Sequence, residues 1–143
     1  SVIFGKQSIV TTIDVKKRNN EYFVYNKNEG IKNINLKDHI KNLQEYAGEL
    51  IIQSVDNDGK MIGYDLNLFD KINNQIKIPF TFAGGAGNIN HINQIIKKNT
   101  ISACACGSLF VFKKKRGVVL INYLNHEEKI KINELFNFTK NNI

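Results

Sequence analysis

Several short segments of the chain carry the residue types that acid–base chemistry and anion binding need. Asp14 follows an apolar run rich in β-branched residues, so its carboxylate could give or take a proton during a reaction. Asp58 and Gly59 follow a second apolar run, and glycine-containing segments at 84–87 and 107–108 follow two more. Glycines let the backbone approach an anion, and a helix starting after such a loop offers unpaired N–H donors. The pattern predicts a phosphate site beside acidic groups.

Each of these segments also has a purely structural interpretation. Asp14 could cap a helix or lie on the surface, and Asp58 could belong to an Asp-Gly turn. The glycines at 84–87 could form a tight turn. Because all of these segments follow apolar runs, we expect Asp14, Asp58, Gly85 and Ser108 to lie on one rim of the fold, which favours the chemical interpretation.

The elements that must position these residues alternate along the chain. Short apolar runs with β-branched residues predict strands, and longer segments with helical spacing predict helices between them. The predicted strands lie at 8–13, 50–55, 78–83 and 101–105, with a short extra strand at 21–25 before a loop at 26–35 and an extended segment at 118–123. The predicted helices lie at 36–46, 65–74, 89–98 and 127–138.

Alternation of this kind predicts an α/β fold in which parallel strands are joined by crossover helices. Four strand–helix units are too few for a closed eight-stranded barrel, which takes about 200 residues or more. We therefore expect residues 1–143 to form a single domain, either an open α/β sheet or half of a barrel.

The composition limits the classes of partner that the chain is expected to bind. The 20 basic and 13 acidic residues give a net charge of +7, but only the run at 113–116 is densely basic and no aromatic residues interleave with it, so nucleic acid is not expected. No apolar stretch approaches the length of a membrane span and no leader is visible, so we expect a cytoplasmic protein.

Cys104 and Cys106 exclude a disulfide scaffold and are interpreted as small strand residues. No histidine falls in ligand-like spacing with them, so no metal is expected.

Three segments together resemble a known family. They are IDVKK at 13–17, AGELIIQSVDNDGKMIGYDL at 47–66 and AGGAGN at 83–88. In order, interval and context they resemble the HisF family, the cyclase subunit of imidazole glycerol phosphate synthase. The resemblance covers nearly the whole chain and implies the C-terminal half of a (β/α)8 TIM barrel, with four parallel strand–helix units.

The resemblance also implies residue roles. Asp14 corresponds to the family's catalytic aspartate on the fifth strand, and Glu49 to an acidic residue near the ammonia entrance at the opposite face of the barrel. One of the family's two phosphate sites would comprise Asp58, Gly59, Gly85, Gly107 and Ser108. The implied reaction is that of a lyase of histidine biosynthesis: ammonia from a glutaminase (HisH-like) subunit cyclises a phosphorylated ribulosyl substrate. Neither a metal nor an organic cofactor is implied.

Departures from the family pattern leave alternatives open. Asn57 stands where the family has Arg, Lys60 where it has Thr, and Ile34 and Asn35 where it has a Thr-Gly pair. The segments at 107–112 and 117–123 are closer to a HisF-like branch that works in amidation of surface-polysaccharide sugars. The family's other catalytic aspartate lies on the first strand, in the N-terminal half of the barrel. A third interpretation is therefore a half-barrel that binds phosphate without turnover unless that half joins it.

Overall fold

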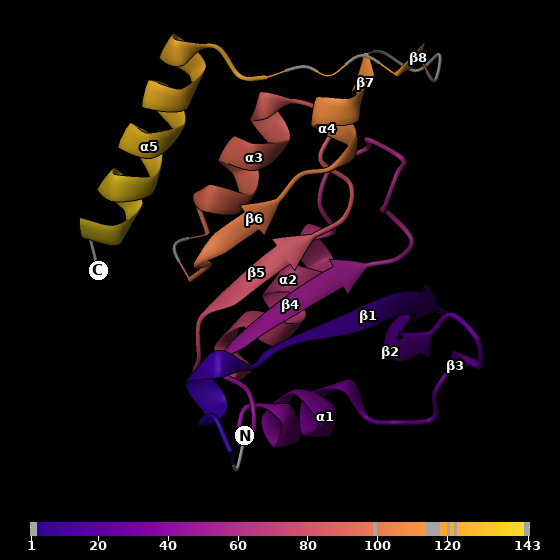
Figure 1. Cartoon of the computed structure of the whole chain (residues 1–143). Helices are drawn as coiled ribbons and strands as arrows, with labels where there is room; N and C mark the ends of the chain where they lie inside the picture. The colour runs from indigo at the N-terminus through magenta and orange to yellow at the C-terminus, as the bar shows by residue number, and fades with distance from the viewer. Residues whose placement is uncertain (1–2, 99, 114–117, 120, 122, 142–143) are drawn as a thin grey trace.

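The centre of the molecule is the parallel part of a six-stranded sheet (Figure 1). The computed structural model describes residues 3–98, 100–113, 118–119, 121 and 123–141. Strands β1 (Val10–Arg18), β4 (Glu49–Ser54), β5 (Phe80–Ala83) and β6 (Ala103–Ala105) lie side by side in chain order, each parallel to the next. The predicted α/β class is confirmed, and four parallel strands in this order are the arrangement expected of half a (β/α)8 barrel.

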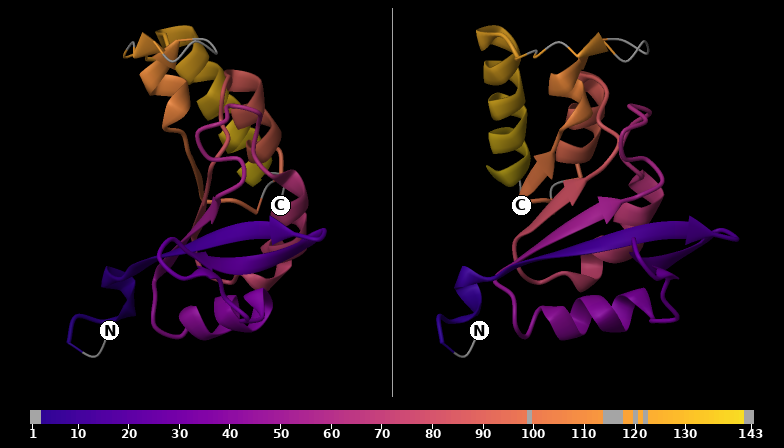
Figure 2. Two further views of the ribbon diagram at one scale, coloured as in Figure 1. Left: turned by 90° about the vertical axis from the view of Figure 1, so that its right-hand side faces the viewer. Right: turned by 45° about the vertical axis from the view of Figure 1, so that its right-hand side comes forward.

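Helices connect the parallel strands and cover one face of the sheet. Helix α1 (Leu36–Leu43) precedes β4, α2 (Leu66–Ile72) precedes β5 and α3 (Ile89–Ile96) precedes β6. After β6 come the short helix α4 (Ser108–Val111), the antiparallel pair β7 (Phe112–Lys113) and β8 (Val118–Val119), and helix α5 (His126–Asn141). Helix α5 lies beside α3 on the outside of the molecule (Figure 2). Two 3-10 turns, Lys6–Ser8 and Asn73–Gln75, complete the described elements.

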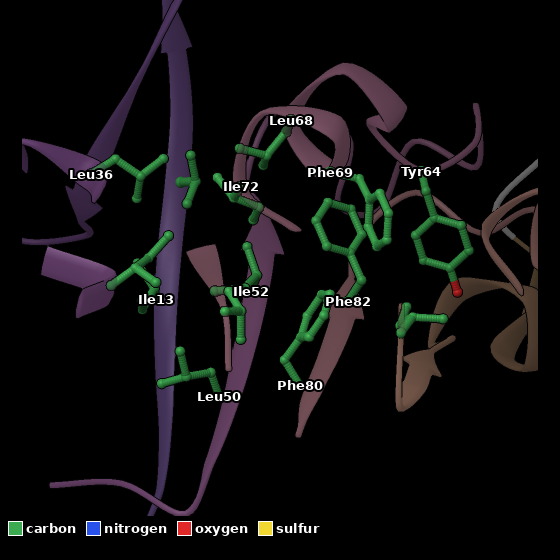
Figure 3. Close-up of a cluster of buried hydrophobic side chains, with 14 of the residues drawn as sticks. Ile13, Leu36, Leu50, Ile52, Tyr64, Leu68, Phe69, Ile72, Phe80 and Phe82 are labelled. Carbon is green, nitrogen blue, oxygen red and sulfur yellow. The ribbon is translucent and has the colours of Figure 1, made fainter. Parts of the chain in front are cut away.

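The hydrophobic core lies between the sheet and these helices. Alternate strand residues point into it, as the two-residue period of a strand requires. It is built from Ile13 and Val15 of β1, Leu50 and Ile52 of β4, Phe80 and Phe82 of β5, and buried leucine, isoleucine and phenylalanine side chains of the helices (Figure 3). The Phe69 ring of α2 contacts the rings of Phe80 and Phe82 at centroid distances of 5.8 and 5.5 Å. The strand residues between these therefore face the other side of the sheet.

Strand β1 is longer than the sequence predicts. It continues past Asp14 to Arg18 and turns back through Asn19 and Asn20 into β2 (Glu21–Asn26), which pairs with it antiparallel. Both turn residues have positive φ angles of 48° and 65°, the pattern of a two-residue hairpin turn that asparagine tolerates. Because the extension is rich in polar residues, the apolar runs in the sequence do not predict it. The expected short strand at 21–25 is confirmed, and β3 (Gly30–Ile31) adds an edge strand in what was predicted as loop.

Other element ends differ by a few residues. Asp65 caps α2 instead of lying in it, and α1 ends at Leu43, before the predicted end at 46. The predicted extended segment at 118–123 is seen as β8, while positions 120 and 122 lie outside the described residues, as does most of the basic run at 113–116. None of the helices in the described part of the chain is long and apolar enough to cross a membrane.

Candidate functional site

Asp14 belongs to a row of residues that crosses the sheet near the carboxyl ends of the parallel strands. Register places it beside Gln53 of β4, Gln53 beside Ala83 of β5, and Ala83 beside Ala105 of β6. Its neighbours Ile13 and Val15 are buried in the core, so the half-buried Asp14 faces the open side of the sheet. The expectation that Asp14 ends its strand is wrong, because β1 continues into the hairpin. Asp14 still lies where the parallel part of the sheet ends.

Asp58 is connected to this row by a hydrogen bond. It lies in the loop between β4 and α2, which turns sharply after β4: the Asp58 amide donates to the Ser54 carbonyl at 3.0 Å. Gln53 Nε2 donates to Asp58 Oδ2 at 3.2 Å. Asp58 and Gly59 are both exposed. The amide of Gln53 thus joins the Asp58 carboxylate to the strand position next to Asp14.

Gly85 lies at a close contact between two loops. It is buried, with a φ of +106°, and its carbonyl accepts a hydrogen bond of 2.8 Å from the Gly63 amide. A Cβ at this position would overlap the Gly63 carbonyl and lie 3.0 Å from the Cβ of Asn57. Gly85 therefore allows the loop after β5 to pack on the loop after β4. In the same loop, the Gly87 amide donates to His91 Nδ1 at 3.1 Å.

Gly107 and Ser108 lie at the start of α4, directly after β6 ends. Gly107 is exposed with ordinary backbone angles (φ −96°, ψ −67°), and a Cβ there would meet open space. Ser108 is half-buried. The structure thus brings Asp14, Asp58 and the loops that contain Gly85 and Gly107 to one end of the sheet, as the sequence predicts, and both Gly59 and Gly107 are exposed there.

Glu49 lies at the other end of the sheet. It is the first residue of β4 and pairs in register with Val10 at the start of β1. Its Oε1 accepts a hydrogen bond of 2.9 Å from the Thr81 hydroxyl of β5. Glu49 therefore faces the same open side of the sheet as Asp14, four residues further toward the amino end of β4 than the row containing Asp14.

An open cavity of about 780 Å³ lies between the β1–β2 hairpin and the loop after β4. Lys17 and Arg18 line it from the hairpin, and Asp56 and Asp65 from the loop. Asp56 Oδ2 accepts a hydrogen bond of 2.6 Å from the Lys17 amide, which fixes the base of the hairpin to the loop. Among the described residues, no group of three or more His, Cys, Asp or Glu side chains could hold a metal ion.

Sequence patterns missed one contact at the same end of the sheet. Tyr64, from the loop after β4, is 6% exposed, and its hydroxyl lies 2.9 Å from the Ala105 carbonyl and 3.0 Å from Cys106 Sγ. Hydrogen bonds from Cys104 and Tyr64 lower the pKa of Cys106 to about 7, although burial opposes them. The Cys-x-Cys spacing was the available signal, but the tyrosine is 42 positions away from Cys106 in the sequence.

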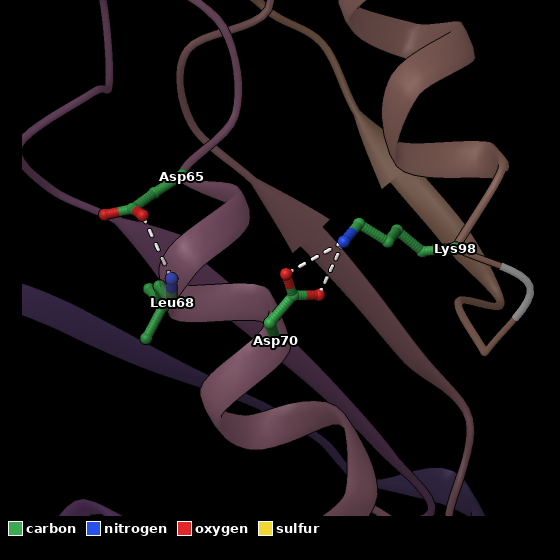
Figure 4. Close-up of polar contacts among 4 residues, drawn as sticks. All are labelled: Asp65, Leu68, Asp70 and Lys98. Atoms are coloured by element: carbon green, nitrogen blue, oxygen red, sulfur yellow. Dashed lines mark hydrogen bonds and ion pairs between the residues drawn. The ribbon is translucent and has the colours of Figure 1, made fainter.

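The hairpin and the loop after β4 are also joined to α2. The Asp65 side chain accepts the Leu68 amide at 3.0 Å and thereby caps the helix (Figure 4). Both of its oxygens accept the Tyr22 hydroxyl, at 2.9 and 3.0 Å. Burial, followed by these contacts with Asp65, raises the pKa of Tyr22, which therefore stays a hydrogen-bond donor. The loop that carries Asp58 is consequently anchored to both the hairpin and the helix.

A parallel sheet with helices on one face, and with loops carrying acidic and glycine residues at its carboxyl end, is the arrangement of half a (β/α)8 barrel. The family described as "Histidine biosynthesis protein" matches residues 1–116. The chain therefore belongs to this family.

Individual relatives support the same family assignment. The chain is 42% identical over 132 residues to a protein of Leptospira borgpetersenii and 41% identical over 137 residues to one of Vibrio vulnificus. They are provisionally named imidazole glycerol phosphate synthase subunit HisF and subunit hisF3, respectively. These matches cover 87% and 92% of this chain but 51% and 52% of the relatives. A protein of Sulfurisphaera tokodaii that carries the HisF name is 39% identical over 98 residues, which are 66% of this chain and 39% of that protein. The chain thus spans about half the length of the curated relatives it matches.

Proposed function

We propose that this chain is a single domain that forms the C-terminal half of a HisF-type cyclase subunit of imidazole glycerol phosphate synthase. In this function, ammonia from a HisH-like glutaminase subunit cyclises a phosphorylated ribulosyl substrate in histidine biosynthesis. The N-terminal half of the barrel is the second partner that turnover requires. Membership of the family and the identity to HisF-named proteins support the proposal.

One geometric observation carries the assignment of the site. Asp14, Gln53, Ala83 and Ala105 stand in one register row, and the loops that follow this row carry Asp58, Gly107 and Ser108. A carboxylate and an open glycine loop at one end of a parallel sheet suit acid–base work on a substrate whose phosphate is held at a distance from the reacting centre.

In the proposed mechanism, Asp14 takes and returns protons during ring closure. Ser108 and the backbone N–H groups at the start of α4 hold one terminal phosphate of the substrate. Gly59 and Asp58, from the loop after β4, lie on the other side of that phosphate. Asp58 is itself acidic, so its contribution is to hold its loop through Gln53 rather than to attract the phosphate. Gly85 supports the site by packing the two loops together. Glu49 lies at the entry point for ammonia.

The test is ammonia-dependent turnover with the barrel completed. The chain is combined with the N-terminal half of the Leptospira borgpetersenii relative, and consumption of the phosphorylated ribulosyl substrate is followed with ammonium chloride as nitrogen source. Asp14→Asn should lower kcat by about 10²- to 10⁴-fold, the usual contribution of a general acid or base. The KM should change little, because the phosphate contacts lie on other loops.

Asp38→Asn is the matched control, because Asp38 is an exposed carboxylate on α1, away from the register row. Its turnover should equal that of the unmodified chain. Near-normal turnover in Asp14→Asn would remove Asp14 from the mechanism. A completed barrel that binds the substrate but never converts it would favour the interpretation as a binding module.

A further inference from the structure

The two cysteines and one tyrosine at the carboxyl end of β6 form a cluster, here called the thiol cluster (Tyr64, Cys104 and Cys106). Cys104 lies in β6 and Cys106 directly follows the strand; both thiols are free, half-buried and packed against the edge of the core. The Tyr64 ring is fixed by an edge-on contact with Phe82, with ring centroids 6.1 Å apart. Its hydroxyl is thereby held 3.0 Å from Cys106 Sγ.

The three groups of the thiol cluster do not ionise equally. The neighbouring Cys104 thiol, followed by the Tyr64 hydroxyl, lowers the pKa of Cys106 to about 7 against burial. The proximity of Cys106, followed by burial, raises the pKa of Cys104, and burial raises that of Tyr64. The two titratable groups that act on Cys106 are thus Cys104 from β6 and Tyr64 from the loop after β4. Cys106 is the first of the three to lose its proton.

The Tyr64 hydroxyl can serve both states of Cys106 because it has two acceptors within reach. While Cys106 is a thiol, the Tyr64 hydroxyl donates to the Ala105 carbonyl, 2.9 Å away, and can accept the S–H of Cys106. When Cys106 is a thiolate, the same hydroxyl proton turns to the sulfur. A hydrogen bond to an ionised acceptor is stronger than one to a neutral acceptor, so this rotation stabilises the thiolate.

We propose that Cys106 is a peroxide-reactive modification site and that Cys104 is its resolving thiol. The thiolate of Cys106 attacks one oxygen of hydrogen peroxide, the O–O bond breaks, and the products are a sulfenic acid and hydroxide. The Cys104 sulfur then attacks the Cys106 sulfur, a disulfide forms, and water leaves with the Cys104 proton. In sum, two thiols lose two hydrogens and one peroxide becomes two waters.

Closing this disulfide must bend the end of β6. Residues i and i+2 of an extended strand lie about 6.6 Å apart, near the upper limit for the Cα atoms of a disulfide. The bend falls at Ala105 and Cys106, next to the exposed Gly107 that begins α4. Oxidation should therefore displace Gly107 and Ser108 and weaken phosphate binding. This consequence rests on the proposed function, whereas the thiol chemistry does not.

The first experiment measures which thiol reacts. The full chain is treated with iodoacetamide at pH 7, and peptide fragmentation assigns the label to Cys104 or Cys106. Because the neighbouring Cys104 and the Tyr64 hydroxyl lower the pKa of Cys106, more of it is thiolate than of an ordinary thiol. After allowing for the lower nucleophilicity of a weakly basic thiolate, its labelling should still be at least about twofold faster. The same chain unfolded in urea, where the two thiols are equivalent, is the reference. Equal labelling in the folded chain, or faster labelling of Cys104, would overturn the proposal.

Single substitutions test the role of each group in the thiol cluster. Tyr64→Phe keeps the ring contact with Phe82 but removes the hydroxyl, so the labelling of Cys106 should slow toward that of the unfolded chain. With peroxide, the unmodified chain should lose the mass of two hydrogen atoms. Cys104→Ser should instead give a sulfenic acid at Cys106 that dimedone traps, and Cys106→Ser should give no adduct at Cys104. A dimedone adduct in the Cys106→Ser variant, or free Cys106 after peroxide, would contradict the assigned roles.

Calorimetry with inorganic phosphate tests the coupling. The oxidised chain should bind phosphate about tenfold or more weakly than the reduced chain, the size expected when one hydrogen bond to a charged group is lost. Equal binding by the two forms would overturn the coupling. Absence of binding by the reduced chain would instead refute the phosphate site of the proposed function, and the labelling and peroxide results would still decide the thiol chemistry.

Discussion

At the level of single residues, two glycines at the same end of the sheet differ in whether a side chain could replace them. Gly85 is buried at a positive φ, and any side chain there meets the Gly63 carbonyl of the neighbouring loop. Gly107 is exposed, has ordinary backbone angles and faces open space. Both follow a strand in the sequence, and the sequence predicts that both contribute to one phosphate site. The distinction depends on packing between loops more than 20 positions apart, which no local pattern encodes.

This difference predicts opposite effects of the same substitution. Gly85→Ala should lower the free energy of unfolding by more than about 2 kcal/mol, because an alanine at positive φ is strained and its Cβ forces the two loops apart. Gly107→Ala should change it by less than about 1 kcal/mol, since the added methyl group meets only solvent. Urea denaturation of both variants measures the two values. Equal stability of the two variants would mean that the loops do not pack as described.

At the scale of elements, the sequence was informative where side chains alternate between core and solvent. Helical spacing identified α1, α2 and α3, and apolar runs identified the four parallel strands, because burial imposes those periods. The hairpin arm of β1 was missed, since Lys16 and Lys17 cover aromatic rings of β2 (Tyr25 and Tyr22, at 4.9 and 5.6 Å) instead of entering the core. The contact of Tyr64 with Cys106 was also missed, because it joins elements remote in the sequence.

Asp65 joins three of these elements, which gives it a larger role than an ordinary cap. Asp65→Ala removes the cap of α2 and leaves the Tyr22 hydroxyl without its acceptor, so the free energy of unfolding should fall by about 2 kcal/mol. Asp65→Asn keeps an oxygen for the Leu68 amide and should cost less. Asp70→Ala is the control from the same helix: its pair with Lys98 (2.7 Å) is largely exposed and should be worth less than about 1 kcal/mol. A loss in Asp70→Ala as large as that in Asp65→Ala would contradict the assigned role.

At the scale of the whole molecule, the two faces of the sheet differ in what covers them. The face toward α1, α2 and α3 is apolar and buried. The other face presents Thr81 and Ala103 together with the row of Asp14, which ends at Ala105. On one side of the sheet, β2 covers only residues 15–18 of β1 and in turn pairs with the edge strand β3, and β6 is the last strand on the other side. Unpaired strand margins and an open inner face are surfaces that proteins normally cover. In a closed barrel, four further strands would cover both.

Association through the open face predicts a specific effect of charge. Expressed as these 143 residues, the chain should associate with the N-terminal half of a relative or with itself, as sedimentation measures. Ala103→Lys should weaken this association at least tenfold, because the exposed Ala103 faces the open side and a closed barrel would bury the new ammonium group. Asn42→Lys adds the same charge on the exposed surface of α1 and should leave association unchanged. Equal weakening by both variants would indicate that net charge, not the open face, controls assembly. A monomer that stays monomeric beside the N-terminal half would contradict the half-barrel as an assembling unit.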